Sequence, residues 1–261
     1  MEMPSAKKNF LTKHMNIFVD GDDTEVYIPM DDLRKCRLEE EYDWYGKDVY
    51  VGVDLAQTSD NTAISMVAYD SYLRKFVVKS WAFIPADRVH IKSKEEKIDY
   101  DIYIEKGHCF ACGDNVVDYG LIEQFVADLG QKYKVNILDI GYDRYNCVSS
   151  ANKWYSMGLN VTEIRQHSSV LHAPTKFFKE KVLQEEVLYE RNPLLEINFA
   201  NARLVQDTNL NGYLNKKKST GKIDMCASLI NAMVFWEKEF ADGRSVYDDY
   251  SEQRKDTFII L

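Results

Sequence analysis

The stretch that decides the fold is VYVGVDLAQTSDNTAI, which runs from Val49 to Ile64. Its apolar first half is rich in β-branched residues, and this pattern predicts a buried strand that ends at Asp54. The polar residues after Asp54 predict a turn into a second strand. A carboxylate at the end of a buried strand costs free energy unless a cation, a partner group or water compensates it. We therefore expect Asp54 to be a functional residue.

Three successive strands are predicted around this stretch. They cover residues 47–54, 62–69 and 76–84, with a turn at 70–72, and together they form an antiparallel meander.

Strands and helices alternate after the meander. An amphipathic helix over residues 118–132, capped by Asp118, leads to a fourth strand at 135–142, which we expect to lie parallel to the first. The later predicted elements are a helix capped by Ser149 or Ser150 that ends at Gly158, a strand at 161–164, a helix over 176–186 capped by Thr175, a helix from Asn192 to about Ala202, a hairpin around Asn211 and Gly212, and a helix over 222–240.

This order of elements is that of a ribonuclease H-like α/β fold. We expect a mixed sheet, with an antiparallel meander followed by parallel strands, flanked by helices. Residues 1–45 show no strong hydrophobic period and are expected to form a connecting arm. The compact domain is expected over residues 46–241, and residues 242–261 form a C-terminal tail.

Further acids stand at the boundaries of predicted elements. Asp143 ends the strand at 135–142, and Asp224 opens the last helix, where the helix dipole stabilises a carboxylate. Asp60 follows Asp54 in the same turn. Carboxylates are the ligands that Mg²⁺ prefers, and two divalent ions held about 4 Å apart hydrolyse phosphodiesters in many nucleases. We expect Asp54, Asp143 and Asp224 to hold such ions, with Asp60 as an additional catalytic acid.

Structural explanations remain open for each acid. Asp54 and Asp60 are common turn residues, Asp143 precedes Arg144 and can form an ion pair, and Asp224 can simply favour the helix start.

The composition sets further limits. The 261 residues, 45% of them hydrophobic, are enough for a large core, and no apolar run approaches the ~20 residues that cross a bilayer. Five scattered cysteines indicate reduced thiols and an intracellular protein. Cys109 and Cys112 have the C-x-x-C spacing of a zinc site, but the sequence contains no second such pair to complete it. A net charge of −9 disfavours nucleic acid unless basic residues gather locally.

A basic run precedes Asp224. It contains Lys216, Lys217, Lys218 and Lys222. These side chains can contact DNA phosphates near the metal ions, although a solvated charge run is an equal alternative.

Residues 10–240 resemble the nuclease domain of tailed-phage terminase large subunits. The resembling pieces are FLTKHMN (10–16), GVDLA (52–56), GDNVVDY (113–119), GYD (141–143), NPLL (192–195) and the segment 216–224 that ends in KID. The resemblance implies an endonuclease that uses Mg²⁺ or Mn²⁺, two ions when active, to cut concatemeric double-stranded DNA without strong sequence preference. It also implies that Asp54, Asp143 and Asp224 are the metal ligands and that Asp60 assists.

The resemblance also implies partners and a location. These are an ATPase motor domain, a small terminase subunit and the portal, in the cytoplasm of an infected or lysogenic bacterium, with no membrane partner. One departure is plain: this chain lacks the G-x-x-x-x-G-K-[ST] loop of the motor and looks like the nuclease half alone.

Other functions remain open. A resolvase or transposase has the same core fold, and a DNA-docking or portal-docking module would use the acids structurally. Sugar kinases and actin-like ATPases share the fold as well, but this chain, with 12 glycines, has no Gly-rich segment of the kind that binds their ATP phosphates.

Overall fold

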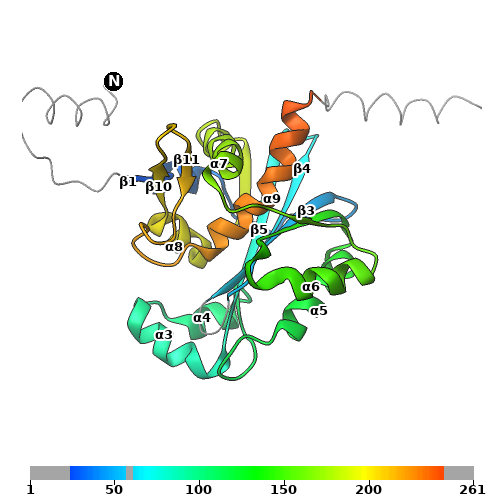
Figure 1. Cartoon of the computed structure of the whole chain (residues 1–261), viewed down its shortest axis with the longest axis vertical. Coiled ribbons are helices and arrows are strands. Elements are labelled where there is room, and N and C mark those ends of the chain that lie inside the picture. Colours follow the sequence, from blue (N-terminus) through cyan, green and yellow to red (C-terminus); the bar gives the residue numbers. More distant parts are fainter. Residues whose placement is uncertain (1–23, 57–60, 244–261) are drawn as a thin grey trace, which may run out of the picture.

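The computed structural model describes residues 24–56 and 61–243, and in this part of the chain an eight-stranded sheet forms the centre (Figure 1). The strand order is β2, β9, β5, β4, β3, β7, β8, and β6 also pairs with β5. The strands are β2 (Arg37–Leu38), β3 (Asp48–Asp54), β4 (Thr62–Asp70), β5 (Lys75–Ile84), β6 (Cys109–Ala111), β7 (Asn136–Tyr142), β8 (Val161–Glu163) and β9 (Val187–Glu190).

The predicted meander is confirmed. Strands β3, β4 and β5 pair antiparallel in sequence, and β7 lies parallel to β3 on its other side. A parallel neighbour needs a crossover, which the chain between β5 and β7 provides. The carboxyl ends of β3 and β7 therefore meet at the same edge of the sheet.

Helices cover both faces of the sheet (Figure 1). They are α2 (Met30–Lys35), α3 (Val89–Glu96), α4 (Tyr100–Glu105), α5 (Tyr119–Tyr133), α6 (Arg144–Ser156), α7 (Ser168–Leu183), α8 (Pro193–Asn201) and α9 (Asp224–Ala241). One apolar core includes residues of α7, α8 and α9, and a second includes residues of α5 and α6. Because neighbouring residues of a strand face opposite sides, Tyr50 joins the first core and Val51 the second.

A small second sheet lies beside the main one. In it β10 (Arg203–Gln206) pairs with β1 (Thr24–Val26) and with β11 (Gly212–Leu214), so the predicted hairpin is confirmed. The carboxylate of Asp207 holds its turn by accepting hydrogen bonds from the backbone of Asn209 and Asn211.

Part of the expected connecting arm belongs to the fold. Tyr27, Ile28 and Leu33 are buried in the core, and β2 extends the main sheet by pairing parallel with β9. These elements are too short to produce a hydrophobic period, so the sequence pattern did not reveal them.

Two predicted helix starts are wrong. The α6 segment begins after Asp143, which caps it, and its regular turns follow a kink at Tyr145 and Asn146, so it does not begin at Ser149 or Ser150. Thr175 lies buried inside α7, which begins at Ser168 and contains Pro174 in its interior. In the described ranges, no helix has both the length and the apolar composition needed to cross a membrane.

Candidate active site

The close packing of α9 on β3 brings Asp54 and Asp224 together. A Cβ at Gly52 would lie 1.8 Å from the Ser228 backbone oxygen, and a Cβ at Gly141, its neighbour on β7, would lie 2.8 Å from the Asn231 backbone oxygen. Only glycine at these positions allows the helix backbone to approach the sheet so closely. The first residue of α9 therefore lies next to the last residue of β3.

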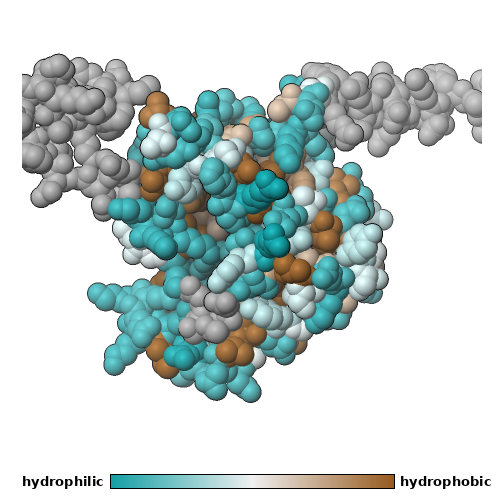
Figure 2. Space-filling view, viewed as in Figure 1, coloured by the Kyte–Doolittle hydropathy of each residue, from teal (hydrophilic) through white to brown (hydrophobic). Residues whose placement is uncertain are grey.

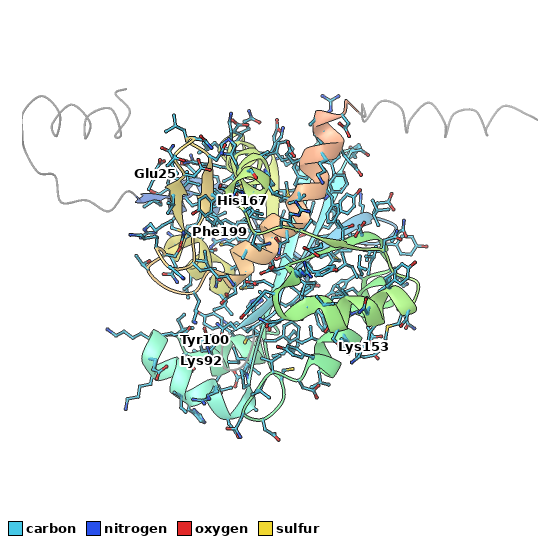
Figure 3. All side chains as sticks on the ribbon, viewed as in Figure 1. Glu25, Lys92, Tyr100, Lys153, His167 and Phe199 are labelled. Atoms are coloured by element: carbon cyan, nitrogen blue, oxygen red, sulfur yellow. The ribbon has the colours of Figure 1, made fainter. Side chains whose placement is uncertain are left out.

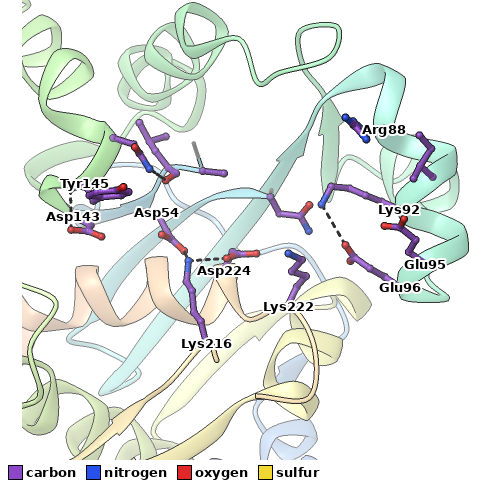
Figure 4. A pocket seen from close by; sticks show the side chains of 15 residues that line it. Asp54, Arg88, Lys92, Glu95, Glu96, Asp143, Tyr145, Lys216, Lys222 and Asp224 are labelled. Atoms are coloured by element: carbon purple, nitrogen blue, oxygen red, sulfur yellow. Dashed lines mark hydrogen bonds and ion pairs between the residues drawn. The ribbon is translucent and has the colours of Figure 1, made fainter. Parts of the chain in front are cut away.

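An ammonium group joins these two carboxylates. Lys216 Nζ lies 2.5 Å from Asp54 Oδ2 and 2.8 Å from Asp224 Oδ1 (Figure 4). Both acids are buried, whereas about half of the Lys216 side chain is exposed. The lysine enters from the segment between β11 and α9 and compensates charge that would otherwise be costly to bury.

Asp143 lies at the same edge of the sheet. It follows β7 directly, and its Oδ1 accepts a hydrogen bond of 3.1 Å from the Tyr145 backbone N–H at the start of α6. The chain is not helical at Tyr145 and Asn146, and Asn146 has a φ of 72°. This kink lets Asn146 Nδ2 donate to the Leu55 carbonyl, 3.4 Å away, which connects the ends of β3 and β7.

The electrostatics of the cluster are those of crowded acids. Burial raises the pKa of Asp54 to about 7; Lys216 opposes this increase, while Asp224 and Asp143 add to it. Burial also raises the pKa of Asp143, against the Tyr145 hydrogen bond. For Lys216, burial disfavours the charged form, but Asp54 and Asp224 raise its pKa overall. A bound cation therefore stabilises the ionised form of these acids.

The three acids line one cavity of about 600 Å³. Its other walls carry Arg88 and Lys92 near and on α3, and Lys222 beside Asp224 (Figure 4). On the face seen in Figure 2 the molecule is hollowed and mainly hydrophilic between the hairpin side and α3. Basic side chains therefore gather near the acids, although Glu95 and Glu96 line the same cavity and the whole chain is acidic.

The carboxylate oxygens of Asp54, Asp143 and Asp224 are the atoms that could hold a metal ion. Among the described residues no three acidic, His or Cys side chains are grouped closely enough to hold a metal in the arrangement shown. In that arrangement the Lys216 ammonium group lies between Asp54 and Asp224. However, Asp224 Oδ2 is buried and accepts no hydrogen bond. A divalent ion with hard oxygen ligands suits this site for two reasons. The Asp224 oxygen lacks a partner, and two further carboxylates lie nearby. The acids already bind one cation, the Lys216 ammonium group.

Only some of the other candidate residues lie near the three acids. Asp60 lies outside the described residues. Lys222 lines the cavity with the acids, and Lys217 lines an adjoining one. The Lys216 side chain is half exposed, but its ammonium group is bound by the two carboxylates and not presented as a free phosphate contact. Cys109 and Cys112 are buried free thiols with raised pKa values, because burial disfavours the thiolate.

Sequence reasoning missed the wall opposite the acids. Lys92 in α3 is only 6% exposed, and its Nζ lies 3.4 Å from Glu96 Oε1. Lys92 and Tyr100 lie together on this side of the molecule (Figure 3), where the Tyr100 hydroxyl donates to Glu96. The spacing of four between Lys92 and Glu96 was the available signal.

Comparison with known proteins agrees with this architecture. The family model "Terminase large subunit, endonuclease domain" matches residues 2–239. The large terminase subunit of Enterobacteria phage HK97 is 21% identical over 203 residues, which are 77% of this chain and 40% of that protein. This chain thus spans less than half the length of that relative.

Solved structures show the same fold. The crystal structure of the HK97 large terminase superimposes with a TM-score of 0.74 at 20% identity, over 89% of this chain and 48% of that one. The large terminase nuclease of the thermophilic phage G20c with bound magnesium gives 0.51 at 13% identity, over 82% and 98%. The expected ribonuclease H-like fold is confirmed. With the family model covering most of its length, the chain belongs to the family of terminase large-subunit endonuclease domains.

Proposed function

We propose that this chain is a divalent-metal-dependent endonuclease that cuts concatemeric double-stranded DNA during viral DNA packaging. The observation that carries the proposal is the meeting of Asp54 and Asp224 on one cation, with Asp143 in the same cavity. Asp54, Asp143 and Asp224 would hold two Mg²⁺ or Mn²⁺ ions, which would activate water and stabilise the leaving oxygen. Asp60 would assist from the following turn.

The residues of this chain would contribute binding and orientation. Arg88 and Lys222 lie on the cavity wall, where they can contact phosphates on either side of the bond to be cut. The Asp143 carboxylate is oriented by the Tyr145 N–H, so that one of its oxygens is committed to the helix start and the other is available to the site. Raised pKa values at Asp54 and Asp143 mean that cation binding and carboxylate ionisation are coupled, as expected for metal ligands.

The partners and the location follow from the family and remain proposals. The chain would act with an ATPase motor, a small terminase subunit and the portal, in the cytoplasm of an infected or lysogenic bacterium. The G20c nuclease was crystallised with bound magnesium and with bound cobalt, which supports the use of divalent ions here.

Plasmid cleavage tests the proposal. The purified chain should cut supercoiled DNA with Mn²⁺ or Mg²⁺ and should be inactive in EDTA, and Asp54→Ala or Asp143→Ala should reduce cutting to background while the circular dichroism spectrum is kept. Asp87→Asn is the matched control, because Asp87 is exposed and lies outside the cavity. Cutting by both alanine variants at the parent rate would refute the site assignment, and metal-independent DNA binding without any cutting would favour a docking module.

A further inference from the structure

Lys216 reaches the acid cluster from a different part of the fold than its partners. Asp54 ends β3 and Asp224 begins α9, whereas Lys216 lies two residues after β11. Its Nζ is within 2.8 Å of both carboxylates, so the space between Asp54 Oδ2 and Asp224 Oδ1 is filled. A second cation cannot bridge these two oxygens while the ammonium group is there.

The backbone that carries Lys216 is held firmly. Asn215 Oδ1 accepts from the backbone N–H groups of Lys217 and Lys218, at 3.0 and 3.2 Å, and the Ser219 hydroxyl donates to the Asn215 carbonyl. The Asn215 N–H in turn donates to Arg203 O on β10. Movement of Lys216 therefore needs only its side-chain torsions to change.

The hairpin before this segment is anchored as well. The Ser168 hydroxyl donates to Asp207 Oδ2 at 2.6 Å, and the Gly212 N–H donates to His172 Nδ1 at 2.8 Å. Both contacts fix the hairpin to α7. Lys216 is thus presented to the acids by a rigid frame rather than by a loose loop.

Open space lies on both sides of the lysine. The 600 Å³ cavity and a neighbouring cavity of about 470 Å³ share Asp54, Asp143 and Lys216 in their walls. The second cavity continues over Tyr213 and Ile223. The ammonium group can therefore leave the carboxylates for either cavity without repacking of the core.

We propose that Lys216 is the resident counter-cation of the acid cluster and that a divalent metal ion binds by displacing its ammonium group from Asp54 and Asp224. The proposal rests on the proposed function, because it concerns the same metal ligands. In the metal-free protein the ammonium stabilises the buried carboxylates. A divalent ion carries twice the charge and can replace it, but two short charge-assisted hydrogen bonds must first be broken, and this lowers the affinity for the metal. Lys216 would therefore set the metal concentration at which the site fills.

Metal affinity provides the first test. Binding of Mn²⁺ to the purified chain, without DNA, is measured by titration calorimetry and by the loss of free Mn²⁺ signal in electron paramagnetic resonance. Lys216→Met removes the ammonium group and keeps an unbranched side chain, whereas Lys217→Met makes the same change of net charge one residue away. We expect at least a tenfold lower dissociation constant for the first Mn²⁺ with Lys216→Met, and less than a twofold change with Lys217→Met.

Chemical modification of the parent chain provides a second test that needs no variant. Reductive methylation followed by peptide mass spectrometry measures the accessibility of each lysine amine. Methylation of Lys216 should be several-fold slower in EDTA than in saturating Mg²⁺, whereas Lys217 should react equally in both. The ion pairs with Asp54 and Asp224 protect the amine only while no metal is bound.

The outcomes separate the two proposals. Suppose that the parent and Lys216→Met bind Mn²⁺ with equal affinity, and that Lys216 stays protected from methylation in Mg²⁺. The proposed displacement is then wrong, but the proposed metal site is still supported. If neither protein binds Mn²⁺, the metal site itself is wrong, and the displacement falls with it. Should Lys216→Met fail to fold, the methylation of the parent decides the question alone.

Discussion

Replacing Asp54 by Asn should stabilise the metal-free protein. Asn has nearly the same shape as protonated Asp and carries no charge that needs compensation. Burial raises the pKa of Asp54 to about 7 from a usual value of 3.8, so the folded protein binds this proton more tightly than the unfolded chain does. Ionisation of Asp54 therefore costs stability, despite the ion pair with Lys216.

The size of this effect follows from the pKa difference. It corresponds to about 4 kcal/mol. The favourable contribution of the protonated acid is complete below pH 4 and is lost as the pH rises to about 7. Above that pH, Asp54→Asn should be more stable than the parent by up to about 4 kcal/mol, or roughly 8–15 °C in Tm; near pH 4 the two proteins should be equally stable.

Urea denaturation in EDTA, at a series of pH values from 4 to 9, measures this difference. Asp87→Asn serves as the control and should follow the parent at every pH. The same Asp54→Asn protein should lose Mn²⁺-dependent cutting, so that stability and activity change in opposite directions. A variant less stable than the parent at pH 8, or a difference that does not shrink toward pH 4, would show that Asp54 is a structural acid satisfied by Lys216.

Three other changes test the framework of the site. Gly52→Ala should destabilise the fold by at least about 3 kcal/mol in urea denaturation, because its Cβ would collide with the α9 backbone. Gly130→Ala in α5 is the control: its Cβ would meet only one atom, at 3.5 Å, so the change should be neutral or stabilising by up to about 1 kcal/mol. Asp143→Asn should abolish plasmid cutting without loss of stability, because Asn also caps helices and burial raises the pKa of the acid that it replaces. Asp143→Ala should be about 1 kcal/mol less stable than Asp143→Asn, and equal stability of these two variants would disprove the capping role. Asp207→Ala should speed hydrogen exchange of the Gly212 amide, measured by mass spectrometry, without affecting α9 amides; unchanged exchange would mean that the turn does not anchor the hairpin.

The sequence by itself determined the order of the main elements. The apolar runs of β3, β4, β5 and β7 fixed the meander and the parallel strand, because hydrophobic period is a local property of the chain. The acids Asp54, Asp143 and Asp224 stood out for the same reason, since a charged residue at the boundary of an apolar element is visible without knowledge of the fold.

Only the tertiary structure decided what those acids contact. That Lys216 binds between Asp54 and Asp224, which lie 162 and eight residues from it along the chain, depends on α9 lying against Gly52. The burial of Tyr27 and Leu33 depends likewise on partners more than a hundred residues away, such as Thr175, whose carbonyl accepts from the Tyr27 hydroxyl. A local pattern records which residues are apolar or charged, but the free energy of a buried charge depends on neighbours that only the folded chain supplies.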